Sequence, residues 1–313
     1  MNYVLHRFQQ LIPILFGITF LSFLLMHMAG SDAVTEMYTN RGVEAAQELI
    51  DMRKADLGPD LPFFQQYLSW LWAMLHGDMG TSYVTGEPVL EAFWRKLPAT
   101  LLLTALSIVL TVVISIPGGI MAAIHHDKIT DHFLSCCSFI GNAMPNFFVG
   151  MLLMQFLGIQ IGVLPVISSG ISLESAIMPT LTLSIAMSAK YLRQVRSTVL
   201  DELNKDYVMG ARARGVSMRI ILWKNVMKAS MLTIMTLLAL SIGSLLGGTA
   251  IIESIFMWDG VGKLAVDAIN MRDYPLIQAY VIWMSVIYVF VNLAADVLYH
   301  QLDPRIRLGG NRK

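Results

Sequence analysis

The sequence predicts an all-α membrane protein with six transmembrane helices, and three observations carry that prediction. The first is composition: of 313 residues, 55% are hydrophobic and 14% are charged, whereas a soluble domain carries about a quarter charged residues. The second is a series of uncharged runs close to the roughly 20 residues that a helix needs to cross a bilayer. The third is the uneven distribution of Lys and Arg between these runs. The net charge of zero gives no reason to expect a nucleic-acid partner.

Six uncharged runs are the candidate spans. The third is long enough for one span and a loop, or for two spans. The fourth is short, and we expect it to extend to Leu192 while Lys190 reaches back to the membrane surface. The runs lie at residues 8–28, 99–124, 132–173, 175–189, 229–252 and 274–295.

The distribution of basic residues decides between six and seven spans. With six spans and a cytoplasmic N-terminus, the cytoplasmic pieces hold 15 of the 22 Lys and Arg residues and the external pieces hold 7. Dividing the third run would move the loop 190–228, with its nine basic residues, to the outside. Cytoplasmic loops are enriched in Lys and Arg, so we predict six spans with both the N- and C-termini in the cytoplasm.

Three parts follow along the chain. Residues 1–28 are expected to be a cytoplasmic N-terminus and an uncleaved first span, because the apolar run is too long for a signal peptide. Residues 29–97 are an external helical segment, in which "AAQELIDMRKADLG" and "FFQQYLSWLWAMLHGDMG" each predict a helix. Residues 98–313 are a five-span core with a cytoplasmic loop at about 190–228. The second external helix is expected to be amphipathic, with one stripe formed by Phe63, Tyr67, Trp70, Leu71 and Met74. The aromatic residues of this stripe suit a membrane interface, and a small packed external cap is the compatible alternative.

No catalytic or cofactor motif is present. "DGVGKLA" resembles part of a phosphate-binding loop, but Leu264 stands where that loop needs Ser or Thr for magnesium. Paired acids are absent from the middle of the runs, which disfavours an enzyme and an ion-coupled pump. The adjacent cysteines form neither a disulfide framework nor a metal motif. We therefore expect no enzymatic activity, no cofactor and no metal site.

The fifth run contains small residues at helical spacing. "SIGSLLGG" places Gly243 and Gly247 four residues apart, and Gly248 follows. Small residues at that spacing allow two helices to approach closely. We expect these glycines to serve helix packing or to line a pathway.

A basic segment interrupts the apolar runs at 206–230, "DYVMGARARGVSMRIILWKNVMKAS". Ala211, Ala213 and Gly215 have little side-chain bulk, so a partner could approach the backbone, and Arg212 offers charge that would fix the register. The same composition suits a helix that lies on anionic lipid at the inner surface. The residues alone leave both interpretations open.

The segment "YVMGARARGV" resembles the coupling segment of permease subunits of ABC importers, in the dipeptide, oligopeptide and nickel class. The resemblance extends over essentially the whole chain. It is carried by "RFQQLIPILFGITFLSFLL", "DLGPDLPFFQQYLSWLWAMLHGDMGTSYVTGEPV", "LPATLLLTALSIVL", "MPNFFVGMLL", "GTAIIESIFMWDGVGKLAVDAINMRDYPLIQ" and "LDPRIR".

The resemblance implies a type I ABC importer permease fold in the cytoplasmic (inner) membrane. It implies a second permease subunit, two ATP-binding subunits and an external solute-binding protein as partners. Ala211, Arg212, Ala213 and Gly215 are then the expected ATPase-coupling residues. Asp259, Gly260 and Asp273 are the expected external docking residues, because they lie in a sizeable external piece.

Two departures from the family pattern stand out. Lys228-Ala229 and Leu232 replace an Asn-Ala and a Pro, so the helix is expected to continue there, and the external loop reads Trp-Asp-Gly rather than Trp-Pro-Gly. The paired tryptophans of "WLWAML" and the "MPNF" and "TSYVTGEPV" segments resemble nickel-type permeases. They favour nickel or a nickel chelate as the substrate, with oligopeptides or dipeptides as the alternative.

Two functions of another class are a stand-alone channel and a membrane anchor. Neither explains why the basic segment is present.

Overall fold

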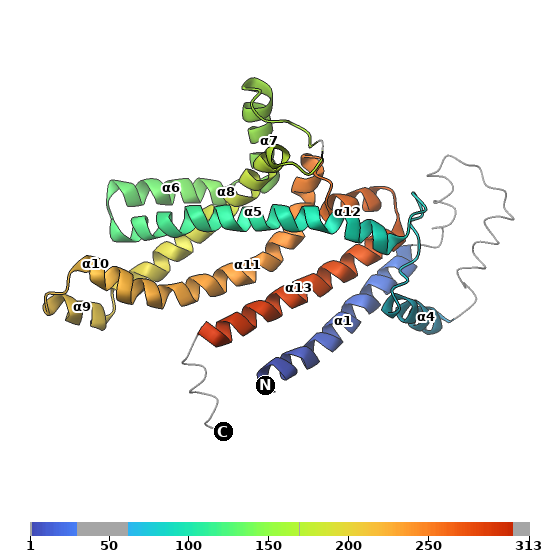
Figure 1. The fold of residues 1–313 in the computed structure, drawn as a ribbon, viewed down its shortest axis with the longest axis horizontal. Helices are drawn as coiled ribbons and strands as arrows, with labels where there is room; N and C mark the ends of the chain where they lie inside the picture. The colour runs from blue at the N-terminus through green and yellow to red at the C-terminus, as the bar shows by residue number, and fades with distance from the viewer. Residues whose placement is uncertain (1, 30–61, 169, 303–313) are drawn as a thin grey trace. The chain divides into compact units, whose positions relative to one another are not determined.

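The computed structural model describes residues 2–29, 62–168 and 170–302. The described chain is helical apart from one isolated bridge between Thr81 and Pro88 (Figure 1). It forms two compact units: residues 1–100 with 259–290, and residues 101–258 with 291–313. The all-helical prediction is confirmed within the described residues.

The first unit joins the N-terminal helix to the external segment. It contains α1 (Asn2–Ala29), α4 (Phe63–Leu75), the start of α5 (Val89–Ile124), α12 (Val261–Asn270) and most of α13 (Tyr274–Leu302). The predicted helix over "FFQQYLSWLWAMLHGDMG" is therefore confirmed as α4. The predicted helix over "AAQELIDMRKADLG" lies outside the described residues.

Aromatic packing holds α4 against α1. Tyr67 is fully buried, and its ring lies edge-on to Phe16 and Phe20, with centroids 5.8 and 5.4 Å away. The Tyr67 hydroxyl lies 3.0 Å from Thr19 Oγ1, so its polar end is also satisfied. The opposite face of α4 leaves Trp72 exposed, so Tyr67 of the predicted stripe packs against α1, as the packed-cap alternative requires.

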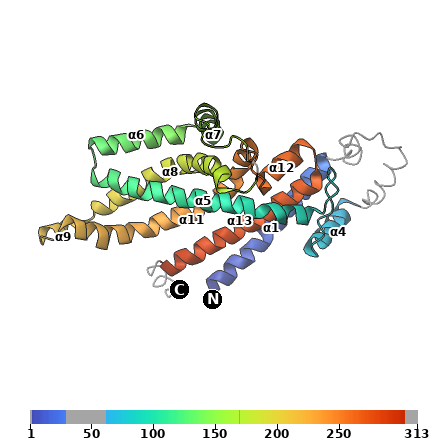
Figure 2. The ribbon, with the colours of Figure 1, turned by 45° about the horizontal axis from the view of Figure 1, so that its top comes forward.

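The second unit is built around a long central helix, α8 (Leu173–Leu203). Both α6 and α11 pack against α8 (Figure 2). Besides the remainder of α5, the unit contains α6 (Ile129–Ala143), α7 (Asn146–Leu153), the π-helix η1 (Met154–Gln160), α9 (Asp206–Ala213), α10 (Met218–Ile220), the π-helix η2 (Ile221–Val226) and α11 (Met227–Ile255).

Two glycines let α5 approach α8 closely. A Cβ added to Gly119 would lie 2.6 Å from the Val195 side chain and 2.8 Å from the Leu192 carbonyl oxygen. At Gly118 a Cβ would lie 2.9 Å from the Leu192 side chain. Farther along the same pair of helices, Ser184 Oγ donates to the carbonyl oxygen of Ser107 at 3.2 Å. Contact therefore extends over several helical turns.

The third apolar run is a broken helix rather than a straight span. The α6 axis and the axis of the following helical stretch differ by 102°. Pro145 causes the break, because proline has no amide hydrogen and disfavours helical backbone in the residue before it. Met144 accordingly has an extended ψ of 132°.

Helices apolar and long enough to cross a membrane are fewer in the described residues than predicted. Two helices meet that description, Val89–Ile124 and Tyr274–Ala294, and the bent pair makes a third if it counts as one span. The number of spans and the side of each terminus therefore remain predictions. α8 is not among the described helices that are long and apolar enough to cross a membrane.

Candidate functional site

The basic segment folds into a short helix that is anchored on one face. Val208 of α9 is fully buried and Ala211 is 5% exposed. Both belong to one hydrophobic core with Ile221 and Val226 of η2 and with Val199 of α8. Ala211 thus holds α9 in place and does not contribute to its free surface.

Gly215 ends this helix in a left-handed turn. Its φ is +78°, its amide donates to the carbonyl oxygen of Arg212 at 2.9 Å, and the Val216 amide donates to that of Ala211 at 3.1 Å. These two bonds are the Schellman motif, which favours glycine because other residues are strained at positive φ. Gly215 therefore lies just beyond the helix, which ends at Ala213.

The free face of this region combines cationic and apolar side chains. Arg212 and Ala213 are exposed, and Arg212 Nη2 lies 3.3 Å from the sulfur of Met218. Met209 is 58% exposed and Ile220 is 48% exposed. Arg and Met are enriched at protein interfaces, where apolar area surrounds a few charges.

A buried carboxylate fixes the entrance to α9, a feature that the sequence analysis missed. Glu202 lies at the end of α8 and is 9% exposed. It pairs with Lys205 and accepts a hydrogen bond of 3.0 Å from the Tyr207 hydroxyl. Burial, together with the hydrogen bond to Glu202, raises the pKa of Tyr207 to about 12. The three residues span six positions, but no motif identifies them.

An ion pair at the start of α6 also escaped the sequence analysis. Arg196 of α8 binds both carboxylate oxygens of Asp131, with Nε–Oδ1 at 2.5 Å and Nη2–Oδ2 at 2.7 Å. Asp131 is 1% exposed. Sixty-five positions separate the two residues in the sequence, so no local pattern points to the pair.

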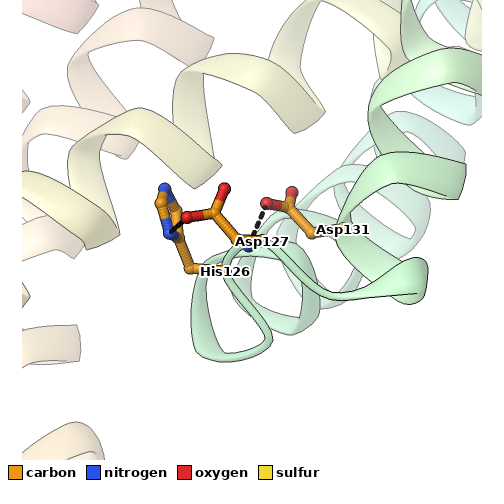
Figure 3. Close-up of side chains that lie close together, drawn as sticks. All are labelled: His126, Asp127 and Asp131. Carbon is orange, nitrogen blue, oxygen red and sulfur yellow. Dashed lines mark hydrogen bonds and ion pairs between the residues drawn. The ribbon is translucent and has the colours of Figure 1, made fainter.

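The same carboxylate belongs to a small cluster of metal-ligand types (Figure 3). His126, Asp127 and Asp131 place ligand atoms within 4.8 Å of one another. His126 Nδ1 pairs with Asp127 at 2.9 Å, and the Asp127 amide donates to Asp131 at 3.1 Å. A cation here would face the guanidinium of Arg196, because both carboxylate oxygens of Asp131 already accept hydrogen bonds from Arg196. The cluster is better explained as the support of the turn between α5 and α6.

On the predicted external side, Asp273 is a buried acceptor. It is 1% exposed, it accepts from the Ser82 hydroxyl, and it accepts from the Tyr83 and Val84 amides at 3.1 and 3.3 Å. The carboxylate therefore holds the turn that follows α4. This placement gives Asp273 a structural role and leaves its side chain little surface to offer a partner.

Asp259 and Gly260 lie at the start of α12 and differ in exposure. Asp259 is exposed and pairs with Lys96 of α5. Gly260 is buried and is the N-cap residue of α12, and the next amide, that of Val261, donates to Thr100 Oγ1 at 2.9 Å. The backbone bends at Gly260, and Asp259 is the accessible one of the two residues.

The three glycines singled out on α11 differ in solvent exposure. Gly243 is buried, whereas Gly247 and Gly248 are exposed. A Cβ on either exposed glycine would meet nothing within 4 Å. Close packing within this chain therefore does not require glycine at these two positions. η2 leads directly into α11, so the helix continues there without the proline that the family pattern has.

Comparisons with known proteins cover almost the entire chain. Residues 115–308 match the family described as "Binding-protein-dependent transport system inner membrane component", and residues 1–104 match its N-terminal counterpart. The glutathione transport system permease protein GsiC of Escherichia coli strain K12 is 36% identical over 307 residues, which cover 98% of this chain and 99% of GsiC. The oligopeptide transport system permease protein AppB of Bacillus subtilis strain 168 is 38% identical over 316 residues, covering 97% and 98%.

Solved structures show the same fold at lower identity. An inward-facing structure of the MetNI methionine ABC transporter matches with a TM-score of 0.58 and 16% identity. It covers 69% of this chain and 99% of its own. An amino acid ABC transporter structure matches with a TM-score of 0.54 over 67% of this chain and 94% of its own.

Proposed function

The chain belongs to the family of binding-protein-dependent transport system inner membrane components, and on that premise we propose that it forms half of the pathway by which an ABC importer moves peptides across the inner membrane. It is a multi-pass permease subunit with the type I importer fold. The proposed partners are a second permease subunit, two ATP-binding subunits that hydrolyse ATP, and an external solute-binding protein.

Peptides are the proposed substrate because of the relatives. Two permeases that match over nearly their whole length are named for glutathione and for oligopeptides. The nickel interpretation rested on the likeness of short segments, and these relatives give it no support. The oligopeptide alternative agrees better with them.

The α9 region is the proposed contact with the ATP-binding subunits, and one observation favours this over a contact with lipid. A helix that lies in the membrane surface must bury its apolar face among the lipids. In α9 that face, at Val208 and Ala211, is already buried in the protein core. The side that remains free carries Arg212, Ala213 and Met209, a combination suited to a protein groove.

Variants on the free face test the coupling proposal. Arg212→Glu and Met209→Asp should each remove the ATP-binding subunits from the purified complex and abolish uptake, while the amount of permease in the membrane is unchanged. Lys128→Glu is the matched control, because Lys128 is exposed in a different predicted cytoplasmic turn. Normal co-purification and normal uptake in both variants would show that α9 is not the coupling contact.

The substrate is tested in a strain that lacks the gene. Uptake of a radiolabelled tripeptide should be lost, should return with the wild-type gene, and should require the ATP-binding subunits. Uptake of radioactive nickel should stay at the parental level. Loss of nickel uptake with retained peptide uptake would reverse the assignment. ATP-independent peptide flux through the purified chain would instead favour a channel.

Asp259 remains the proposed external docking residue. It is exposed at the start of α12, directly before Gly260, the N-cap residue of that helix. Asp273 supports the same side of the first unit from a buried position, so we propose it as a positioning residue for this surface. A solute-binding protein with complementary positive charge would meet Asp259 first.

A further inference from the structure

A small cavity lies where three helices of the second unit meet. Its volume is about 120 Å³, which is enough for several water molecules. Residues of α7, α8 and α11 line it, and these three helices pack against one another in pairs. Its polar side chains include Lys190 of α8 and Asn146 of α7, and Gly248 of α11 adds no bulk.

Lys190 lies farther from the ends of the predicted spans than the sequence indicates. We expected it at the membrane surface, beyond the end of the fourth run. On α8, however, it lies between Ser184, which bonds to Ser107 of α5, and Leu192, which meets Gly118 of α5. Lys190 is thus level with residues 107–118, in the middle part of the predicted span 99–124.

A lysine at that depth requires an explanation. A cationic side chain at the centre of a bilayer costs at least ~2.5–3.5 kcal/mol, and such residues almost always face a water-filled cavity or a partner of opposite charge. Among the described residues, Lys190 is exposed and forms none of the ion pairs with Asp or Glu. The described part of the chain therefore provides the cation without its counter-ion.

The helix that carries Lys190 is itself polar. α8 is not among the described helices that are apolar enough to cross a lipid bilayer on composition. It buries the hydroxyl groups of Thr180, Ser184 and Ser188. Such a helix suits the interior of a transporter, where water and substrate replace lipid on one side.

We propose that Lys190 and Asn146 form a transient binding site for the terminal carboxylate of a peptide in transit. This inference rests on the proposed function, since it assumes that the chain conducts peptides. The ammonium and the amide N–H groups are both donors, and charge-assisted bonds to a carboxylate are the stronger kind. The cavity admits a carboxylate and the adjoining atoms rather than a whole peptide, so the site selects charge and leaves the sequence of the peptide free.

The first test asks whether the cavity is a water-accessible anion site, without using peptides. Gly248→Cys is introduced into a chain whose Cys136 and Cys137 are serine, because a Cβ on Gly248 meets nothing within 4 Å. The assembled importer is treated with an anionic and a cationic methanethiosulfonate. The anionic-to-cationic ratio of rate constants should fall about fivefold or more when Lys190 is changed to Gln, as expected for one unit charge at contact distance in water.

Two outcomes of this experiment overturn the proposal. A rate ratio that Lys190→Gln leaves unchanged shows that the lysine does not act on anions in the cavity. A thiol at position 248 that reacts with neither reagent, with or without ATP, shows that water does not reach the cavity. Lys128→Gln is the control for charge far from the cavity, and it should leave the ratio unchanged.

The second test uses transport by the complete importer in vesicles. Trialanine and trialanine amide differ only in the terminal carboxylate, and each is supplied with saturating binding protein. Because the binding protein is the same throughout, its own preference cancels when variants are compared. Lys190→Gln should lower the acid-to-amide ratio of uptake rates about tenfold, the value of one charge-assisted hydrogen bond. Lys190→Arg should keep the ratio within about twofold of wild type.

The two experiments separate the inference from the proposed function. If the wild-type importer moves neither peptide, the proposed substrate is wrong, while the thiol experiment still decides whether an anion site exists. If it moves both and Lys190→Gln slows them equally, the carboxylate site is wrong, while peptide import stands.

Discussion

Gly119→Ala is expected to destabilise the second unit, although alanine is the better helix former. The new Cβ would lie 2.6 Å from the Val195 side chain and 2.8 Å from the Leu192 carbonyl oxygen. A backbone oxygen cannot rotate away, and ordinary contact begins at 3.4 Å, so α5 and α8 must separate by about 0.6 Å along that direction. Overpacking of this kind costs ~1–3 kcal/mol, whereas alanine gains ~0.5–1 kcal/mol over glycine in a helix.

These two ranges leave a net loss centred near ~1 kcal/mol and at most ~2.5 kcal/mol, and the central value lowers the Tm by roughly 2–4 °C for a unit of this size. Thermal unfolding of the purified complex, followed by tryptophan fluorescence, measures it. Gly210→Ala on α9 is the matched control, because its Cβ meets nothing within 4 Å; it should be neutral or slightly stabilising. Adding Val195→Ala to Gly119→Ala should recover only part of the loss, since the contact with the Leu192 backbone remains. A Gly119→Ala protein as stable as the Gly210→Ala protein would refute the close approach of the two helices.

Two further outcomes test the buried carboxylates. Arg196→Met should destabilise the complex by about 3 kcal/mol, the low end for breaking a buried ion pair, because it leaves the Asp131 carboxylate buried without its partner while Arg196 itself is 26% exposed. Asp131→Asn in the same chain should recover part of that loss, and thermal unfolding of the single and double variants measures both. Asp273→Ala should cost about 1–3 kcal/mol, since it removes the acceptor of the 82–85 turn, and should speed proteolysis there. Asp259→Ala should change the free energy of unfolding by less than about 1 kcal/mol, because the ion pair of Asp259 with Lys96 is exposed. If a protease cleaved the 82–85 turn at the same rate in Asp273→Ala as in Asp259→Ala, the assigned role of Asp273 would be contradicted.

Periodic features of the fold could be predicted from the sequence. The stripe on α4 was predicted because one apolar face recurs every three or four residues, and its member Tyr67 is buried. The break before α7 was not predicted, although Pro145 was visible. A proline within an apolar run marks either a kink or a loop, and only tertiary contacts distinguish the two.

Pairings between distant residues could not be predicted. Asp131 and Arg196 are 65 positions apart, and each alone resembles an ordinary interfacial charge. Gly215 was expected to let a partner approach the backbone, because the basic segment around it is rich in small residues. The sequence does not show that α9 ends two residues earlier or that Gly215 has a positive φ of 78°.

The contact between Ser82 and Asp273 limits how this permease can be recombined with its relatives. The two residues are 191 positions apart, and they lie in the separately matched N-terminal and C-terminal family regions. A chimaera joined between those regions inherits the turn from one parent and its acceptor from the other. Where the second parent lacks a carboxylate at that position, the exchanged turn loses its support. Exchange of the N-terminal region therefore requires the α12–α13 junction to be transferred with it, so that two segments distant in the gene must vary together.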